Sequence, residues 1–233
     1  MVLIIVCGGD EAGRGALLGP LVVALVAAKE RDVHKLTRIG VRDSKLLTRR
    51  QREMLFVAIR DMAVEVKVGV IEADEINQAM EDRISLNELE AVHFARLFDG
   101  LDSDVDGLYL DSPDVIAEKF GARVSMYSSK PTRLSGKRGA GREGTRIVAE
   151  HKADARFPVV SAASIVAKVT RDNMITALSK ELGVAVGSGY PSDGSTIDAV
   201  RANLHNGELM RHVRMHWSTM QGIKQTRLSS FEP

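Results

Sequence analysis

The sequence has a single cysteine, no long hydrophobic run and almost no net charge. Because Cys7 stands alone, no disulfide can form within the chain, and its place in the apolar run 2–7 favours a buried, inert thiol. The longest apolar stretch, residues 21–28, is far too short to cross a bilayer. The N-terminus also lacks the basic region and apolar core of a signal peptide. We therefore expect a cytoplasmic protein with no membrane partner.

The charge balance excludes recognition of a partner by overall charge. The chain has 32 Lys and Arg residues against 31 Asp and Glu residues, a formal net charge of +1. A nucleic-acid site would have to arise from local clusters of basic residues. The 233 residues, 44% of them hydrophobic, suffice to bury a sizeable core in one large domain or in one domain with a small appendage.

Hydrophobic periodicity predicts an α/β or α+β fold. Apolar and β-branched runs predict strands at residues 2–7, 21–28, 64–70, 108–110 and 123–127. Capping-box pairs, Thr48 with Gln51 and Ser85 with Glu88, predict the starts of two helices. Further helices are expected at residues 115–120, 161–182, 196–205 and 208–215, the first of them stopped by Gly121.

The composition changes between residues 128 and 146. Glycine is frequent there, and Glu143 is the only acid. The basic residues of the segment are Lys130, Arg133, Lys137, Arg138, Arg142 and Arg146. We predict a mobile basic loop rather than a domain boundary.

Two adjacent acids, Asp10 and Glu11, follow the first predicted strand and the pair Gly8 and Gly9. In a regular strand their side chains would point to opposite faces of the sheet. Bringing both to one site requires a bend or bulge, which the glycines make accessible. The alternative interpretation is a solvated acidic turn, for which Gly-Gly-Asp-Glu is equally suitable.

Two further acids occupy similar positions later in the chain. Asp111 ends the strand predicted at residues 108–110, whereas Asp114 is placed to cap the helix that follows. Asp154 comes shortly before a new apolar segment, and its alternative is a surface acid beside Lys152. The candidate site acids are therefore Asp10, Glu11, Asp111 and Asp154.

Carboxylates without a cysteine cluster suit a hard, oxygen-binding cation. Mg²⁺ and Mn²⁺ are such ions, and pairs of them hydrolyse phosphodiesters without a protein nucleophile. Zinc is the alternative, because His212 and His216 stand four residues apart on a predicted helix. No third zinc ligand is evident beside them.

The segment GDEAGRG at residues 9–15 resembles the N-terminal signature of ribonuclease HII and of the eukaryotic type 2 catalytic subunit. Further segments are similar to the remaining motifs of that family, in order: DSKL at 43–46, LNELE at 86–90, DSPD at 111–114, HKAD at 151–154, SAASI at 161–165 and GYP at 189–191. The resemblance covers nearly the whole chain. It implies a ribonuclease-H-like mixed β-sheet flanked by helices, with a mostly helical C-terminal part.

The resemblance also implies the site residues. It makes Asp10, Glu11, Asp111 and Asp154 the catalytic carboxylates, which hold two Mg²⁺ or Mn²⁺ ions together with substrate. The implied substrate-binding residues are Gly13, Arg14, Gly15, Lys45, Ser164, Lys168 and Tyr190.

Their implied roles differ. Residues 13–15 contact a ribonucleotide 2′-hydroxyl and the neighbouring phosphate, and Tyr190 packs on the adjacent sugar. Lys45 contacts a phosphate, as do Ser164 and Lys168, one helical turn apart. The ordinary alternatives are a turn at residues 43–45 and a loop with a packed tyrosine at residues 189–191.

The implied activity is hydrolysis of the RNA strand of RNA/DNA hybrids, with a nick 5′ to ribonucleotides embedded in duplex DNA. The products carry a 3′-hydroxyl and a 5′-phosphate. One competing function is a metal-dependent DNA nuclease or phosphatase that uses the same carboxylates without discriminating the 2′-hydroxyl. The other is a non-catalytic module that binds a clamp or a duplex. We expect a monomer.

The C-terminal end suggests a further partner. Gln225, Leu228 and Phe231 have the Q-x-x-L-x-x-F spacing of a sliding-clamp-binding peptide, although Glu232 replaces the usual second aromatic residue. The alternative is a frayed polar tail. The tail suggests an archaeal-type member of the family. We thus expect a catalytic core at residues 1–183, a helical substrate-binding part at 184–223 and a tail at 224–233.

Overall fold

A computed structural model describes residues 3–135 and 143–229, with side chains described as far as Gln225. The chain forms two compact units, each built from segments that are distant in sequence. The first unit comprises Met1–Ala12, Val22–Gly69 and Asn87–Val169, and the second comprises Gly13–Leu21, Val70–Leu86 and Thr170–Pro233. Each unit is described by itself below. The division at residues 183 and 223 remains a prediction.

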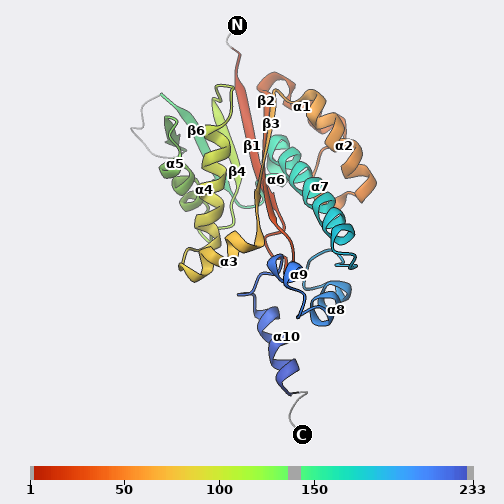
Figure 1. Ribbon diagram of the computed structural model, residues 1–233. Coiled ribbons are helices and arrows are strands. Elements are labelled where there is room, and N and C mark those ends of the chain that lie inside the picture. Colours follow the sequence, from red (N-terminus) through yellow and green to blue (C-terminus); the bar gives the residue numbers. More distant parts are fainter. Residues whose placement is uncertain (1–2, 136–142, 230–233) are drawn as a thin grey trace. The chain divides into compact units, whose positions relative to one another are not determined.

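The main structural element is a mixed six-stranded sheet with the strand order β3-β2-β1-β4-β6-β5 (Figure 1). β1 pairs with β2 in antiparallel fashion and with β4 in parallel, and β6 is parallel to both β4 and β5. The strands are β1 (Ile5–Ala12), β2 (Leu21–Lys29), β3 (Glu65–Ile71), β4 (Gly107–Asp111), β5 (Thr132–Leu134) and β6 (Thr145–Glu150). The mixed sheet agrees with the predicted fold class.

Helices occupy about half of the chain, as expected for this class. The α-helices are α1 (Val33–Arg38), α2 (Arg49–Met62), α3 (Ala73–Glu81), α4 (Leu86–Asp99), α5 (Ala117–Tyr127), α6 (Ala153–Arg156), α7 (Pro158–Glu181), α8 (Gly194–Ala202), α9 (Gly207–Arg211) and α10 (Ser218–Ser229). Within residues 3–135 and 143–229 there are also two 3-10 helices, η1 (Glu30–Asp32) and η2 (Ser44–Leu46). The capping box of Thr48 and Gln51 is present at the start of α2.

Helices α4 and α7 cover opposite faces of the sheet in the first unit. A Cβ atom at Gly8 would meet the backbone of Val159 in α7, whereas one at Gly9 would meet the Phe94 ring in α4. Consecutive residues of a strand face opposite ways, so the two contacts identify the two faces. The core between them is apolar and includes Cys7, where burial raises the pKa of the thiol, as expected for an inert cysteine.

The prediction that Gly121 ends a helix and that residues 123–127 form a strand is wrong. Helix α5 runs through Gly121 to Tyr127. A Cβ atom at Gly121 would lie 3.2 Å from Ala149 Cβ, so the missing side chain lets α5 pack closely against β6. This packing outweighs the cost of about 1 kcal/mol that glycine carries inside a helix. The contact between α5 and β6 therefore overrides the low helix propensity of glycine at this position.

The predicted bounds of two other segments were wrong. The loop expected at residues 128–146 is shortened by β5 and β6, and residues 136–142, with the mobility predicted for them, lie outside the described residues. The helix expected at 208–215 ends at Arg211, after which Val213 pairs with Leu18 in an isolated β-bridge. His212 and His216 therefore do not share a helix, and His216 lies 3.7 Å from Glu81 instead.

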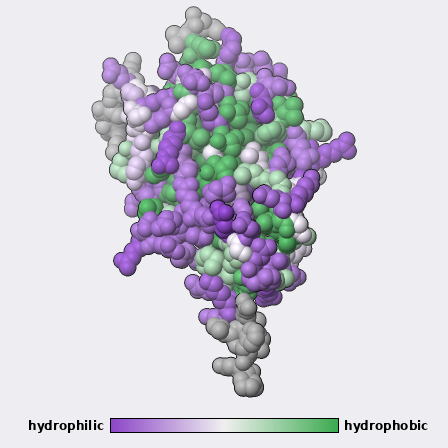
Figure 2. Space-filling view, viewed as in Figure 1, coloured by the Kyte–Doolittle hydropathy of each residue, from purple (hydrophilic) through white to green (hydrophobic). Residues whose placement is uncertain are grey.

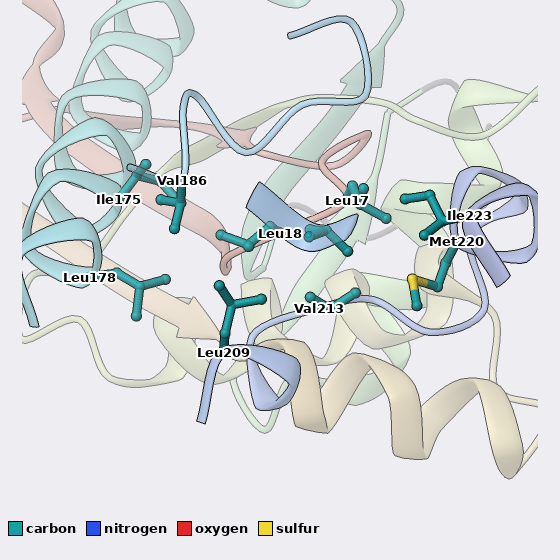
Figure 3. Close-up of a cluster of buried hydrophobic side chains, with 10 residues drawn as sticks. Leu17, Leu18, Ile175, Leu178, Val186, Leu209, Val213, Met220 and Ile223 are labelled. Carbon is teal, nitrogen blue, oxygen red and sulfur yellow. The ribbon is translucent and has the colours of Figure 1, made fainter. Parts of the chain in front are cut away.

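The second unit has its own hydrophobic core (Figure 3). Leu17 and Leu18, from the short segment Gly13–Leu21, lie among side chains of α7 and of the C-terminal helices. The other members are Ile175, Leu178, Val186, Val200, Leu209, Val213, Met220 and Ile223. The segment that follows the acidic pair in sequence is thus anchored by two buried leucines.

The surface mixes hydrophilic and hydrophobic residues, as the face in Figure 2 shows. In the first unit Val115 is 97% exposed and Leu46 is 67% exposed. No helix in the described part of the chain is both long enough and apolar enough to cross a membrane.

Candidate active site

Asp10 is buried at the carboxyl-terminal end of β1, on the face that α7 covers. The two elements approach closely because Gly8, two residues earlier on the same face, has no side chain: its Cβ would lie 2.2 Å from the Val159 carbonyl carbon. The approach brings Ser164 of α7 into hydrogen-bonding contact with the Asp10 carboxylate. Ser164 also lies 2.9 Å from the Ser44 hydroxyl, so a second serine holds it in place.

Glu11 continues the same strand without interruption. The register of β1 with β2 is regular from Ile5 to Ala12 and places Asp10 opposite Ala24 and Glu11 opposite Val23. The expected bend or bulge at the acidic pair is therefore absent. Since adjacent strand residues face opposite ways, β1 by itself does not bring both carboxylates to one face.

Asp111 is brought beside Asp10 by strand pairing. β4 runs parallel to β1 with Leu110 opposite Gly9, so Asp10 and Asp111 are the next residues along the two strands. The Asp111 Oδ1 atom accepts a hydrogen bond of 2.7 Å from the backbone N–H of Ala153. The carboxyl ends of neighbouring parallel strands thus supply two of the four predicted acids, as in many α/β sites.

Asp154 comes from the short helix α6, immediately after Ala153. The turn into α6 is tight, because Lys152 adopts a left-handed conformation with φ of 55°, which is rare for a residue with a side chain. The Ser161 hydroxyl donates to the Asp154 carbonyl oxygen and ties α6 to α7. Asp154 itself is only 9% exposed. Its alternative interpretation as an ordinary surface acid is therefore wrong.

Asp114 is not the helix cap that its position suggested. The residue before α5 is Ile116, which makes no side-chain cap. Asp114 instead accepts hydrogen bonds from the Asn87 amide and the Arg123 guanidinium. Asp114 therefore ties the loop after β4 to α4 and α5.

The charges of the acids act on one another. Burial raises the pKa of Asp10 well above its usual range, and the negative charges of Glu11 and Asp111 raise it further. Burial also raises the pKa of Asp111, and the negative charge of Asp154 raises it further. The hydrogen bond from the Ala153 N–H and the positive charges of Lys45 and His151 lower it. These acids therefore concentrate negative potential in a place where water is scarce.

The donor set fits a hard cation, since it consists of carboxylate oxygens alone. Among the described residues, however, no three Asp, Glu, His or Cys side chains are grouped closely enough to hold a metal ion as they stand. The predicted four-carboxylate metal site is thus not assembled in this structure, and it remains a prediction.

A groove of about 450 Å³ borders Asp154 in the first unit. Its lining includes Asp43 and Leu46 from the segment around η2 and Ser161 from α7. Lys45 lies in the same short helix, near enough for its charge to lower the pKa of Asp111. Ser164 is buried against Asp10 and Ser44, whereas Lys168 is half-buried one turn further along α7. Their predicted contacts with phosphates remain untested.

Residues 13–15 and Tyr190 belong to the second unit. Gly13 has a φ of 94°, and its Cβ would lie 2.3 Å from the Nε atom of Arg171. Gly15 differs, because no atom lies within 4 Å of the position that its Cβ would take. The Tyr190 ring stacks on Arg171, whose guanidinium carbon lies 4.5 Å from the ring centre.

Arg171 is not among the site residues predicted from the sequence. Its spacing from two predicted residues could have indicated it, because Ser164, Lys168 and Arg171 are spaced for one face of a helix, as α7 is.

The predicted clamp-binding residues are described only in part. Gln225 is exposed in α10, Leu228 lies in α10 with its side chain outside the described residues, and Phe231 lies outside them altogether.

Comparisons with known proteins agree with the fold and with the motifs. The sequence model of the family described as Ribonuclease HII matches residues 7–220. The ribonuclease HII of Thermofilum pendens is 41% identical over 224 residues, which cover 94% of this chain and 99% of that protein.

Two solved structures are also similar. The ribonuclease H2 of Pyrococcus horikoshii has a TM-score of 0.81 and 37% identity, covering 96% of this chain and 98% of the other. The ribonuclease HII in a complex with PCNA from Archaeoglobus fulgidus has a TM-score of 0.77 and 34% identity, covering 92% and 96%. The predicted ribonuclease-H-like fold is confirmed.

We expect Asp10→Asn to raise the free energy of unfolding of the metal-free protein at pH 7. The folded-state pKa of Asp10 is raised, so the folded protein loses stability as pH rises from the unfolded-state pKa through the folded-state value. The variant escapes this loss. Its advantage should be largest at pH 7 and should shrink as the pH falls through about 4, below which the aspartate is protonated in the unfolded chain as well.

Denaturant unfolding of both proteins at several pH values measures the difference. Asp32→Asn is the matched control, because Lys35 lowers the pKa of Asp32 and the charge there favours folding. An Asp10→Asn advantage that did not change with pH would contradict the raised pKa that burial and the neighbouring acids give Asp10.

Proposed function

The chain belongs to the ribonuclease HII family and is therefore an endonuclease of the ribonuclease H type, and we propose that it recognises single ribonucleotides embedded in duplex DNA. It nicks 5′ to the ribonucleotide, leaving a 3′-hydroxyl and a 5′-phosphate, and also hydrolyses the RNA strand of RNA/DNA hybrids. The observation that carries the proposal is the set of interacting acids at the ends of β1 and β4 and in α6, of which Asp10 and Asp154 are buried and Glu11 and Asp111 half-buried.

Asp10, Glu11, Asp111 and Asp154 would hold two divalent cations, Mg²⁺ or Mn²⁺, when substrate is present. Bound ions of this kind supply an activated water and stabilise the leaving oxygen. Acids whose negative charges raise one another's pKa are suited to a cation, because a positive charge removes the repulsion between them. A ribonuclease HIII with the same fold, 19% identical to this chain, has been solved in complex with Mn²⁺.

The residues around the acids prepare them for this role. The Ser164 hydroxyl donates to Asp10, and the Ala153 N–H donates to Asp111. Both interactions favour the ionised carboxylate and fix its orientation. Lys45 adds a positive charge near Asp111, where it would contact a phosphate of the strand to be cut.

Discrimination of RNA from DNA would lie with residues 13–15 and Tyr190. The 2′-hydroxyl is the one group that distinguishes a ribonucleotide at a given position. At Gly15 the side-chain position is empty, which leaves the backbone open to close approach. Tyr190 would pack on the deoxyribose that follows the ribonucleotide, where a 2′-hydroxyl would interfere.

The C-terminal tail would bind a sliding clamp. Support comes from the similar ribonuclease HII that forms a complex with PCNA, and from the spacing of Gln225, Leu228 and Phe231. Helix α10 carries the first two of these residues. Docking of a short helical peptide into an apolar groove is a common recognition mode.

A DNA duplex with one embedded ribonucleotide tests the proposed function directly. We expect a single Mg²⁺- or Mn²⁺-dependent nick on its 5′ side, lost on chelation and restored by either ion, with the all-DNA duplex left intact. Asp111→Asn should lose at least about 100-fold in activity, which excludes a contaminating nuclease. Equal cutting of the all-DNA duplex would favour the competing DNA nuclease, and metal-independent activity would contradict the assignment of the acids.

We expect Gly15→Ala to reduce cleavage at an embedded ribonucleotide by about tenfold or more, equivalent to about 1.4 kcal/mol of lost transition-state stabilisation. The added methyl group meets no protein atom, so the free energy of unfolding should change by less than about 1 kcal/mol. Steady-state kinetics and denaturant unfolding measure the two effects. Gly194→Ala is the matched control, since its Cβ position is also empty. Full activity of Gly15→Ala would show that nothing approaches this backbone closely.

Deletion of residues 225–233 should abolish binding to a sliding clamp while leaving cleavage of a short duplex unchanged within about twofold, because the four acids belong to the other unit. Calorimetric titration with Archaeoglobus fulgidus PCNA measures the binding. The full-length double variant Leu228→Ala with Phe231→Ala is the control for loss of chain length. Undiminished binding of either protein would refute the tail as the clamp-binding peptide.

A further inference from the structure

Two arginines, Arg171 and Arg214, have no exposed surface at all and are the largest fully buried side chains in the described part of the chain. Burial of a guanidinium is costly unless all of its donors are satisfied. Burial accordingly lowers the pKa of Arg171. Positions that keep such groups need a reason beyond packing, because an apolar side chain would fill the same space at lower cost.

Arg171 joins two loops of the second unit. Its Nε and Nη2 atoms donate to the carbonyl oxygens of Pro20 and Leu18, at 3.2 and 3.3 Å. Its Nη1 atom donates to the carbonyl oxygen of Ser188 at 3.1 Å, and its flat face lies against the Tyr190 ring. One guanidinium thus holds the segment that begins at Gly13 and the loop that carries Tyr190.

Two glycines make room for this guanidinium. A Cβ atom at Gly13 would lie 2.3 Å from Nε, and one at Gly189 would lie 2.7 Å from Nη2. Both glycines also have positive φ values, of 94° and 82°. Contact with Arg171 therefore explains why residue 13 is a glycine. It does not explain the glycine at residue 15, because no atom lies near the position of its Cβ.

Arg214 provides a natural comparison. Its Nη1 atom donates to the Arg14 carbonyl oxygen at 2.8 Å, and Nε and Nη2 both donate to the Gly19 carbonyl oxygen. Its aromatic partner is Trp217, at 5.1 Å. These three donors of Arg214 all bond to the segment Gly13–Leu21, whereas the donors of Arg171 bond both to that segment and to the loop that carries Tyr190.

We propose that Arg171 is a positioning residue for junction recognition: it sets the distance between the backbone of residues 13–15 and the Tyr190 ring. The inference rests on the proposed function. Residues 13–15 would contact the ribonucleotide and Tyr190 the deoxyribose that follows it. The distance between the two loops must therefore equal the spacing of these two neighbouring nucleotides. The planar guanidinium can donate hydrogen bonds to both loops and at the same time stack on the Tyr190 ring. A lysine ammonium lacks the planar face and the fixed donor geometry.

The loops do not depend on Arg171 alone for their contact. The backbone N–H groups of Leu17 and Leu18 both donate to the Gly189 carbonyl oxygen, at 2.8 and 3.0 Å. Replacement of Arg171 should therefore loosen the spacing without separating the loops. The expected defect is a loss of discrimination between substrates rather than a loss of fold.

The test compares Arg171→Lys with Arg214→Lys on two substrates, a DNA duplex with one ribonucleotide and an all-RNA strand paired with DNA. For Arg171→Lys we expect kcat/KM on the single-ribonucleotide duplex to fall at least about tenfold more than on the hybrid, because only the former presents a deoxyribose to Tyr190. For Arg214→Lys we expect kcat/KM to fall by the same factor on both substrates. Arg171→Met, which buries no charge, should repeat the Arg171→Lys result if the lysine variant does not fold.

A double-mutant cycle with Tyr190→Ala separates positioning from general destabilisation. Once Tyr190 is absent, loss of the Arg171 fork should have little further effect on the substrate ratio. Fluorescence of Trp217, the only tryptophan in the chain, checks that the second unit is intact. Equal losses on both substrates, or fully additive effects, would overturn the proposal. A wild-type enzyme that ignores the embedded ribonucleotide would overturn the proposed function instead.

Discussion

The first unit depends on the close contact between the backbone of α7 and strand β1 at Gly8. Any side chain there would collide with the carbonyl group of Val159. The contact places Ser164 against Asp10, and Ser44 against Ser164. It also fixes α6, through the bond from Ser161 to the Asp154 backbone. The surroundings of two of the four predicted acids, Asp10 and Asp154, therefore depend on the absence of a side chain at Gly8.

Both units bury charge, and they do so with opposite signs. In the first unit, burial and neighbouring acids raise the pKa of Asp10 and Asp111. In the second, Arg171 and Arg214 are buried against carbonyl groups and aromatic rings. Charged groups in such places cost folding free energy, and chains retain them where a site needs them. The acids fit cation binding, and the arginines fit the placement of loops.

The elements predicted from sequence were right where local signals were strong. The strand at 21–28, the helix opened by Thr48 and the long helix after Ser161 all appear near their expected bounds. The failures share a cause. Because glycine disfavours helices, the sequence predicts a stop at Gly121, yet its lack of a side chain is what lets α5 pack on β6. The position of Asp114 predicts a helix cap, yet its partners come from α4 and α5.

The sequence by itself determined the family, the mixed fold and the identity of the candidate acids, because their motifs are contiguous and their residue types restrict the chemistry. It did not determine which acids would share a face. β1 proved regular through Asp10 and Glu11, so proximity to Asp111 came from the pairing of β1 with β4. Nor did it disclose Arg171, whose partners lie up to 153 residues away. Such contacts depend on how distant segments pack, and only the tertiary structure decided them.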